Sequence, residues 1–204
     1  ANPCGAATAS QDLSEAYRKA METDPISAFG GIVALNRPID KKTAEEIAKT
    51  FLEVIIAPGF EEEALNLLQA KKNVRLLQIS GEYQRECLGL DFRRVVGGLL
   101  VQERDMDSFD IRTAKIVTRR VPTEEEYQAL DFAWRVVKHV KSNAIVFTAR
   151  DQLLGVGAGQ MSRVDSVKIA KMKAILPTKG CVLGSDAFFP FRDGVDMAAE
   201  AGIT

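Results

Sequence analysis

The sequence contains few histidines and cysteines, and its net charge is close to zero. It contains one histidine and three cysteines, Cys4, Cys87 and Cys181, which stand far apart in 204 residues. This spacing predicts neither a disulfide framework nor a zinc knuckle, so we expect no metal site and a reducing compartment. The 27 basic side chains balance 28 acidic ones, leaving a formal net charge of −1. We therefore expect neither nucleic acid nor an anionic membrane surface as a partner.

Long apolar runs are also missing. No stretch approaches the ~20 apolar residues that a membrane-spanning helix needs, and no charged-then-apolar leader is present. The cytoplasm is the expected location. Both ends are typical of a piece of a longer protein: the chain enters Asn2-Pro3-Cys4-Gly5 at once, and Ile203-Thr204 resembles the opening of a strand after a helix-ending Gly202.

What the sequence does contain is an alternation of helical and strand-like segments. Helices are expected over Ser10–Glu22 with Ser10 as the cap, Lys42–Phe51, Glu61–Ala70, Thr123–Lys138, Arg163–Lys173 and Val195–Glu200. Strands are expected over Gly31–Leu35, Val54–Ala57, Val74–Ile79, Ala144–Phe147, Leu153–Gly157 and Cys181–Gly184, with a polar loop over Gly81–Asp91 and extended structure over Val95–Gln102 and Ile116–Thr118. The pattern predicts an α/β fold whose sheets are covered by helices on both faces.

A weak internal echo suggests how the chain is organised. Gly30–Ile47 and Lys179–Ala198 share one plan: glycine, buried strand, polar loop with proline, aspartate, helix. We therefore expect two related lobes, about residues 1–80 and 123–204, joined by a linking segment at 81–122. In each copy the loop after the carboxyl end of the strand is the place where an open α/β sheet usually binds ligand.

The segment Ser185–Gly194, SDAFFPFRDG, places three phenylalanines and a proline in a loop just before a helix. Core aromatics would alternate or follow helical spacing. Aromatic side chains beside charged groups after a strand suit a planar ligand. The plainer interpretation is a structural loop in which Asp193 caps the following helix.

A second loop, Gly155–Arg163, has the sequence GVGAGQMSR. Its glycines at 155, 157 and 159 would let the backbone approach a ligand, and the helix start with Arg163 could hold an anion. The loop does not match the dinucleotide fingerprint, because Gln160 and Ser162 stand where that motif needs glycine, and it lacks the lysine of the phosphate loop. A tight structural turn remains the alternative.

Four single residues have both a plain and a functional interpretation. Asn143 is either a turn residue or an amide that reads a ligand's own amide, and Glu53 is either solvated or an acceptor for a ribose diol. His139 fits a solvated helix face. Cys4 has no histidine near it in sequence, which favours a packed loop residue over a nucleophile.

Taken together, these segments resemble the AICAR transformylase family, whose members share a polypeptide with an IMP cyclohydrolase domain. The matching stretches run in family order over essentially the whole chain: Ala1–Ala7, Asp24–Asp40, Glu53–Leu65, Lys71–Leu77, Val95–Asp105, Val140–Val146, Gly155–Ser166 and Ser185–Asp196. GAGQMSR followed by SDAFFPFRD is the most specific part of the match.

The resemblance implies transfer of a formyl group from 10-formyltetrahydrofolate, a co-substrate, to the 5-amino group of AICAR, with no tightly bound cofactor. It implies two cytidine-deaminase-like α/β/α lobes with mixed sheets and without zinc, and a homodimer with sites between subunits. AICAR contacts would fall on Gly30, Glu53, Asn143, Arg163 and Phe188, with Asn143 also assisting catalysis, and folate contacts on Val164, Phe191 and Asp193.

The family's main catalytic pair is a Lys-His dipeptide immediately before the NPCG stretch, and here the chain starts at Ala1. Loss of such a general base could cost ~10²–10⁴-fold in rate, and His139 does not align with it. The cyclohydrolase domain and the family's C-terminal folate contacts are also outside the chain. Two hypotheses follow, a transformylase fragment or an inactive nucleotide-binding or dimerisation fragment. A third, a zinc deaminase, lacks its cysteine and histidine signature.

Overall fold

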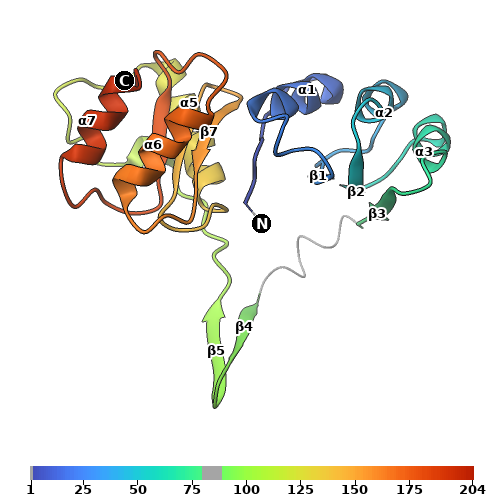
Figure 1. The fold of residues 1–204 in the computed structure, drawn as a ribbon, viewed down its shortest axis with the longest axis horizontal. Helices are drawn as coiled ribbons and strands as arrows, with labels where there is room; N and C mark the ends of the chain where they lie inside the picture. The colour runs from blue at the N-terminus through green and yellow to red at the C-terminus, as the bar shows by residue number, and fades with distance from the viewer. Residues whose placement is uncertain (1, 80–88) are drawn as a thin grey trace.

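The computed structural model describes residues 2–79 and 89–204, which form two helix-covered sheets and a hairpin between them in sequence (Figure 1). One sheet is parallel and the other antiparallel, so the two kinds of pairing are separated along the chain. The predicted α/β class is confirmed. The likeness of each half to cytidine deaminases stays a prediction. No helix in these residues is both long and apolar enough to cross a bilayer.

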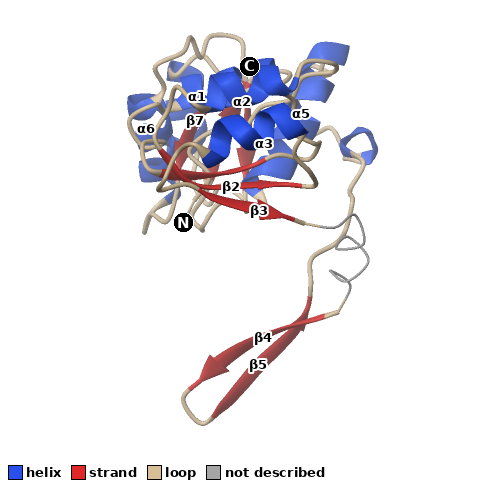
Figure 2. Cartoon of the chain, turned by 90° about the vertical axis from the view of Figure 1, so that its right-hand side faces the viewer, coloured by secondary structure: helices blue, strands red, loops and turns tan. Residues whose placement is uncertain are grey.

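The N-terminal sheet has three parallel strands in the order β1-β2-β3. Its elements are α1 (Leu13–Thr23), β1 (Gly31–Ala34), α2 (Lys41–Ile47), β2 (Leu52–Ala57), α3 (Glu62–Gln69) and β3 (Arg75–Gln78). Tyr17, Ala44 and Ala64, one from each helix, pack with Ile55 of β2 in a single core. All three helices therefore cover the same face, as Figure 2 shows.

The second face of this sheet carries no helix among the described residues. Ile32 of β1 is 67% exposed there and Leu77 of β3 is 49% exposed. Ile32 pairs with Val54 of β2, and Leu77 pairs with Ile56 of β2. Val54 and Ile56 are two residues apart in the strand and so point to the same face, which places Ile32 and Leu77 on that face as well. Parallel sheets are normally covered on both sides. The expected two-sided cover is thus not found here.

The C-terminal sheet is antiparallel, with the order β7-β6-β8. Its elements are α5 (Glu124–Val137), β6 (Ile145–Thr148), β7 (Leu153–Gly157), α6 (Arg163–Lys173), β8 (Val182–Ser185) and α7 (Asp193–Glu200). Helix α5 packs on one face through Ala133 against Val146, and α6 and α7 pack on the other around Phe147. Strand β6 is buried throughout because it is central and covered on both faces.

Between the two sheets the chain forms a hairpin of β4 (Leu90–Val95) and β5 (Gly98–Glu103). The chain reverses at Val96-Gly97, where Gly97 has a φ of 85° that suits glycine. The extended structure predicted over Val95–Gln102 is therefore found only in part: β5 covers residues 98–102, whereas the turn and the strand β4 before it were not predicted. Residues 116–118 form no strand, and a short 3-10 helix, η1, occupies Ile111–Thr113 instead. The expected loop at 81–91 lies mostly outside the described residues.

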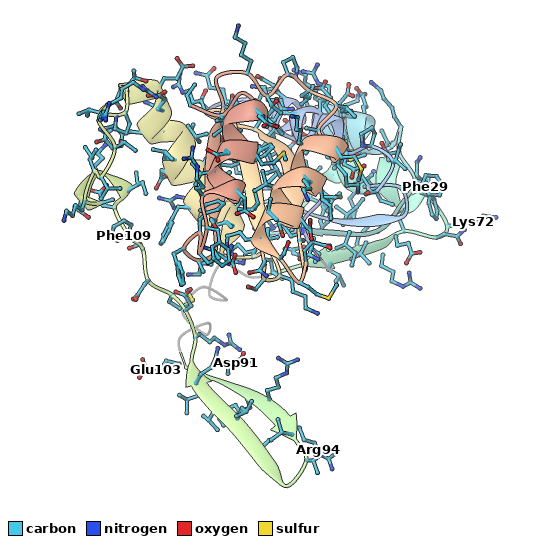
Figure 3. The ribbon with its side chains drawn as sticks, turned by 60° about the vertical axis from the view of Figure 1, so that its left-hand side comes forward. Phe29, Lys72, Asp91, Arg94, Glu103 and Phe109 are labelled. Carbon is cyan, nitrogen blue, oxygen red and sulfur yellow. The ribbon has the colours of Figure 1, made fainter. Side chains whose placement is uncertain are left out.

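Every residue of both hairpin strands is exposed. Figure 3 shows Asp91, Arg94 and Glu103 on the hairpin, clear of the side chains of both sheets. The strand register places Phe92 opposite Val101 and Arg94 opposite Leu99, so these residues share a face.

The two sheets are linked by contacts of α1 with the first residue of β7 and the turn before it. The Thr23 hydroxyl donates to the buried Leu153 carbonyl at 2.6 Å, and the Gln152 side-chain amide donates to the Lys19 carbonyl at 2.8 Å. Lys19 also pairs with Asp151 at 2.8 Å. The N-terminal segment adds to the free edge of β7, where the Leu153 amide donates to the Ala6 carbonyl at 2.9 Å.

Several element ends differ from the sequence prediction. Helix α1 is capped by Asp12 rather than Ser10. Helix α2 ends at Ile47, four residues before the predicted Phe51. Residues 203–204 form no strand, although Gly202 ends α7 with a φ of 85° as predicted.

Candidate functional site

Three loops meet at one edge of the C-terminal sheet. Ile145, the first residue of β6, lies opposite both Gly157 at the end of β7 and Ser185 at the end of β8. Because the strands are antiparallel, the segment entering β6 therefore lies beside the loops that leave β7 and β8. These are the segments that contain Asn143, Arg163 and Phe188. The structure brings these three predicted site loops together.

Arg163 is the centre of this edge. It is the first residue of α6, and its side chain is only 8% exposed. Nη1 donates to Asp186 Oδ1 at 2.5 Å and to Ser185 Oγ at 2.8 Å. Nη2 donates to Asn143 Oδ1 at 2.8 Å. One guanidinium therefore joins all three loops.

The bonding of Asn143 restricts what it can offer a ligand. Its Nδ2 donates to the carbonyl oxygens of Gln160 at 2.9 Å and Met161 at 3.2 Å. An amide nitrogen has two N–H groups, so both are used. Oδ1 accepts one bond, from Arg163, and keeps a second lone pair. Asn143 can therefore accept from a ligand N–H or O–H, but it has no free donor.

Asp186 supplies the negative charge at this edge and was missed in the sequence analysis. Its Oδ1 accepts from the Ala144 amide at 2.8 Å as well as from Arg163. Burial acts to raise the pKa of this carboxyl, but hydrogen bonds from Arg163, Ser142 and the Ala144 amide outweigh it and the pKa is lowered. The carboxylate is thus ionised at neutral pH. An acidic residue directly after a buried strand was the available signal.

The phenylalanines of the loop after β8 point into different surroundings. Phe188 is 80% exposed and Phe191 is 73% exposed. Phe189 instead packs against the core of the C-terminal sheet. Two of the three aromatic rings are therefore available to a ligand or a partner, and the third anchors the loop.

The glycines of the loop Gly155–Arg163 serve mainly packing. A Cβ built on Gly157 would lie 1.8 Å from the Ser166 carbonyl oxygen, and one on Gly155 would lie 2.5 Å from that of Ala170. Both glycines let β7 approach α6 closely. Only Gly159, with a φ of 67° and nearby space, has the freedom first attributed to the whole loop.

The residues expected to contact folate lie beside this edge. Val164 follows Arg163 in α6 and is half-buried. Asp193 is the first residue of α7 rather than its cap, and its Oδ1 accepts from the Gly194 amide at 2.7 Å. Its position in the first turn suits the helix dipole. No described contact tests their predicted role.

Gly30 and Glu53 lie elsewhere, in the N-terminal sheet. Gly30 precedes β1 with a φ of 69°, and its amide donates to the Phe51 carbonyl at 3.0 Å. Glu53 is exposed in β2. Both are at the amino ends of parallel strands, not at the carboxyl ends where we expected ligand. The described hydrogen bonds and ion pairs join neither residue to Asn143 or Arg163.

The remaining candidates show no reactive arrangement. His139 is exposed just after α5. Cys4 lines a cavity of about 260 Å³ with Asp24 and Lys173 between the two sheets, where burial and then Asp24 raise the thiol pKa. Cys87 lies outside the described residues. Within residues 2–79 and 89–204 no three His, Cys, Asp or Glu side chains are grouped as a metal site would require.

Comparison with known proteins gives this arrangement a family. A sequence model described as the AICARFT/IMPCHase bienzyme matches residues 1–173. The chain belongs to this family. It is similar to "Bifunctional purine biosynthesis protein PurH" of Magnetococcus marinus, 53% identical over 213 residues, which cover 99% of the chain and 40% of the relative. The proteins of that name from Sorangium cellulosum and Parvibaculum lavamentivorans are also 53% identical, each over 100% of the chain.

The chain spans about two fifths of the length of these AICARFT/IMPCHase relatives, 39–40%. The match includes the loops of Asn143 and Arg163, whereas the loop of Phe188 lies beyond the residues matched by the family model but within the PurH alignments.

Proposed function

We propose that this chain carries part of the substrate site of a formyltransferase of purine synthesis. In the proposed reaction the amine nitrogen of AICAR forms a bond to the formyl carbon, the bond from that carbon to N10 of tetrahydrofolate breaks, and the amine proton passes to N10. The relatives' names support a role in purine synthesis. The observation that carries the proposal is the Arg163–Asn143 hydrogen bond of 2.8 Å, which joins two of the loops implied in AICAR binding.

The geometry suits an amine-bearing planar substrate. With its donors bound to the backbone, Asn143 presents a lone pair to a substrate N–H, which would orient the amine for attack. The exposed ring of Phe188 offers a face for stacking against a heterocycle. Arg163 has N–H groups beyond those bonded to Asp186, Ser185 and Asn143, and its positive charge favours an anionic or carbonyl group.

Neither Cys4 nor His139 is proposed as the general base. The Cys4 thiol has a raised pKa and so stays protonated near neutral pH. His139 lies exposed after α5 and takes part in none of the described hydrogen bonds that join the three loops. The resemblance assigns this role to a Lys-His pair ahead of Asn2, and the proposal keeps that assignment for the protein of full family length. Folate contacts at Val164, Phe191 and Asp193, and a cytoplasmic location, remain part of the proposal.

A homodimer with sites shared between subunits is the second element of the proposal, and the hairpin favours it. One face of the hairpin presents Leu90, Phe92, Leu99 and Val101, each between 49% and 61% exposed, beside Arg94 and Glu103. An isolated two-stranded hairpin is marginally stable in water, so an apolar face of this kind suits burial against a second copy. In such a dimer, Gly30 and Glu53 of one subunit would lie next to Asn143 of the other subunit, and together they would form one AICAR site.

A formyl-transfer assay tests the catalytic proposal. In a full-length protein that carries this chain, 10-formyltetrahydrofolate and AICAR should give formyl-AICAR and tetrahydrofolate, with kcat/KM lowered at least roughly tenfold by Asn143→Ala. Equal kcat/KM in both proteins would remove Asn143 from the mechanism. If the 204-residue chain alone turned over at the full-length rate, the base would lie within it and our assignment would be wrong.

A further inference from the structure

We infer that Asp186 is a positioning residue for the proposed AICAR site, because it holds Arg163, and through Arg163 the Asn143 side chain, in the binding arrangement. This inference rests on the proposed function. It adds a residue that neither the resemblance nor the comparisons assign.

The first step is the charge balance around Arg163. The guanidinium is nearly buried, and its one ion pair among residues 2–79 and 89–204 is with Asp186, at 2.5 Å. A buried cation without a counter-charge is costly, so removal of the carboxylate would drive the guanidinium toward solvent or bind an ion in its place. Asp186 itself is fixed from the other side, because its Oδ1 also accepts from the Ala144 amide at 2.8 Å.

The second step is the transmission to Asn143. Oδ1 of Asn143 accepts from Arg163 Nη2 at 2.8 Å, and this bond fixes which lone pair remains for a ligand. If the guanidinium moved, Oδ1 would lose its protein partner and its remaining orientation would depend on the backbone carbonyls of Gln160 and Met161 alone. Asp186 therefore acts on the ligand through two hydrogen bonds in series, without needing to touch it.

The third step separates this role from a general effect on the loop. Of the proposed folate contacts, Phe191 lies further along the same loop, Asp193 begins α7 and Val164 follows Arg163 in α6. None of their side chains makes a described hydrogen bond to Arg163 or Asn143. Loss of the Asp186 charge should therefore affect AICAR more than 10-formyltetrahydrofolate. A residue that only stabilised the fold would affect both ligands together.

The test is steady-state kinetics with both substrates on the full-length protein. Asp186→Asn keeps the size of the side chain and removes its charge. We expect the KM for AICAR to rise roughly tenfold or more, equivalent to about 1.4 kcal/mol, with the KM for 10-formyltetrahydrofolate changed less than about twofold. Asp186→Glu restores the charge but displaces it by one methylene. Its KM for AICAR should therefore lie between those of the unmodified protein and Asp186→Asn. Asp196→Asn is the matched control, because among the described residues the Asp196 side chain pairs only with the exposed Arg192, at 2.7 Å.

Three results would count against the inference. An unchanged KM for AICAR in Asp186→Asn would overturn it. The inference would also fail if the KM values for AICAR and for 10-formyltetrahydrofolate rose equally in Asp186→Asn and Asp186→Glu did not lower them again. If Asp186→Asn does not fold, a wild-type KM for AICAR in Asp186→Glu would overturn it. Failure of the proposed function looks different, since the unmodified protein would then bind no AICAR in calorimetry.

Discussion

Phe188 and Phe189 are neighbours in one loop, yet the structure gives them opposite surroundings. Phe188 is 80% exposed, whereas Phe189 packs against the core and its ring would lie 2.6 Å from a Cβ placed on Gly194. The solvent-facing ring is the one proposed to contact AICAR, and the inward-facing ring holds the loop against α7. The two can be separated experimentally.

We expect Phe189→Ala to lower the free energy of unfolding by about 2 kcal/mol, because it removes a half-buried ring. Phe188→Ala should change it by less than about 0.5 kcal/mol, because surface substitutions rarely matter more. Urea unfolding followed by circular dichroism measures both values. Equal losses in the two variants would show that Phe188 is also part of the packing.

The loops that carry the candidate site residues could be singled out from the sequence, but the hydrogen bonds of these residues could not. SDAFFPFRD and GAGQMSR identified the loops of Phe188 and Arg163 through their resemblance to a family. Asp186 was not recognised, because its role depends on Ala144 and Arg163, which lie 42 and 23 residues away in sequence. The same holds for Asn143, whose donors are used by carbonyls 17 and 18 residues along the chain.

Among the helices, α5 begins at the position that local sequence explains most clearly. Thr123 and Glu126 form a capping box. Hydrogen bonds from Arg120 and from the Thr123 amide lower the pKa of Glu126 from 4.5 to about 2. A carboxyl with a depressed pKa contributes stability above its unfolded-state pKa and loses it as the pH falls through the folded-state value.

Glu126→Gln should therefore lower the free energy of unfolding by roughly 1 kcal/mol at pH 7. The difference from the unmodified protein should shrink as the pH falls from about 4.5 toward about 2. Glu125→Gln is the control, since Glu125 lies exposed in the same turn and makes no side-chain hydrogen bond among the described residues. Urea unfolding across this pH range measures the effect, and a pH-independent difference would contradict it.

Elements with a strong local pattern were predicted well. The predicted bounds of α6 and β7 agree with the structure, because a capping residue such as Ser162 before α6 and a continuous apolar run in β7 are properties of the segment itself. The hairpin was missed because its turn, Val96-Gly97, stands inside an apolar run without the usual polar turn pair. The cap of α1 was misplaced by two residues, because Ser10 and Asp12 are both good capping residues.

For the whole molecule, the exposed hairpin leads to a prediction about assembly. Val101 lies on the apolar face with Phe92, and Leu100 lies on the other face opposite Arg93. If a second copy covers the apolar face, Val101→Asp should raise the dimer dissociation constant at least roughly tenfold, because it buries a charge. Leu100→Asp should leave it nearly unchanged. Sedimentation equilibrium measures both, and equal effects would contradict the assignment of the faces.

At this scale the sequence predicted sheets covered by helices on both faces, which is found for the C-terminal sheet but not for the N-terminal one. The bare face of the N-terminal sheet could not be foreseen, because the apolar residues Ile32 and Ile56 have the same pattern whether a helix or another surface covers them. Contacts between the halves, such as Thr23 to Leu153, join residues 130 positions apart and carry no local signal.

The central claim is that the loops joined by Arg163 bind AICAR, and isothermal titration calorimetry tests it most directly. A full-length protein that carries this chain should bind AICAR, and Phe188→Ala and Asn143→Ala should each weaken binding by about 1–2 kcal/mol, five- to thirtyfold in Kd. Leu100→Asp, on the face of the hairpin opposite to Phe92 and Val101, should bind as the unmodified protein does. Unaltered affinity in both site variants, or no binding by the unmodified protein, would contradict the account.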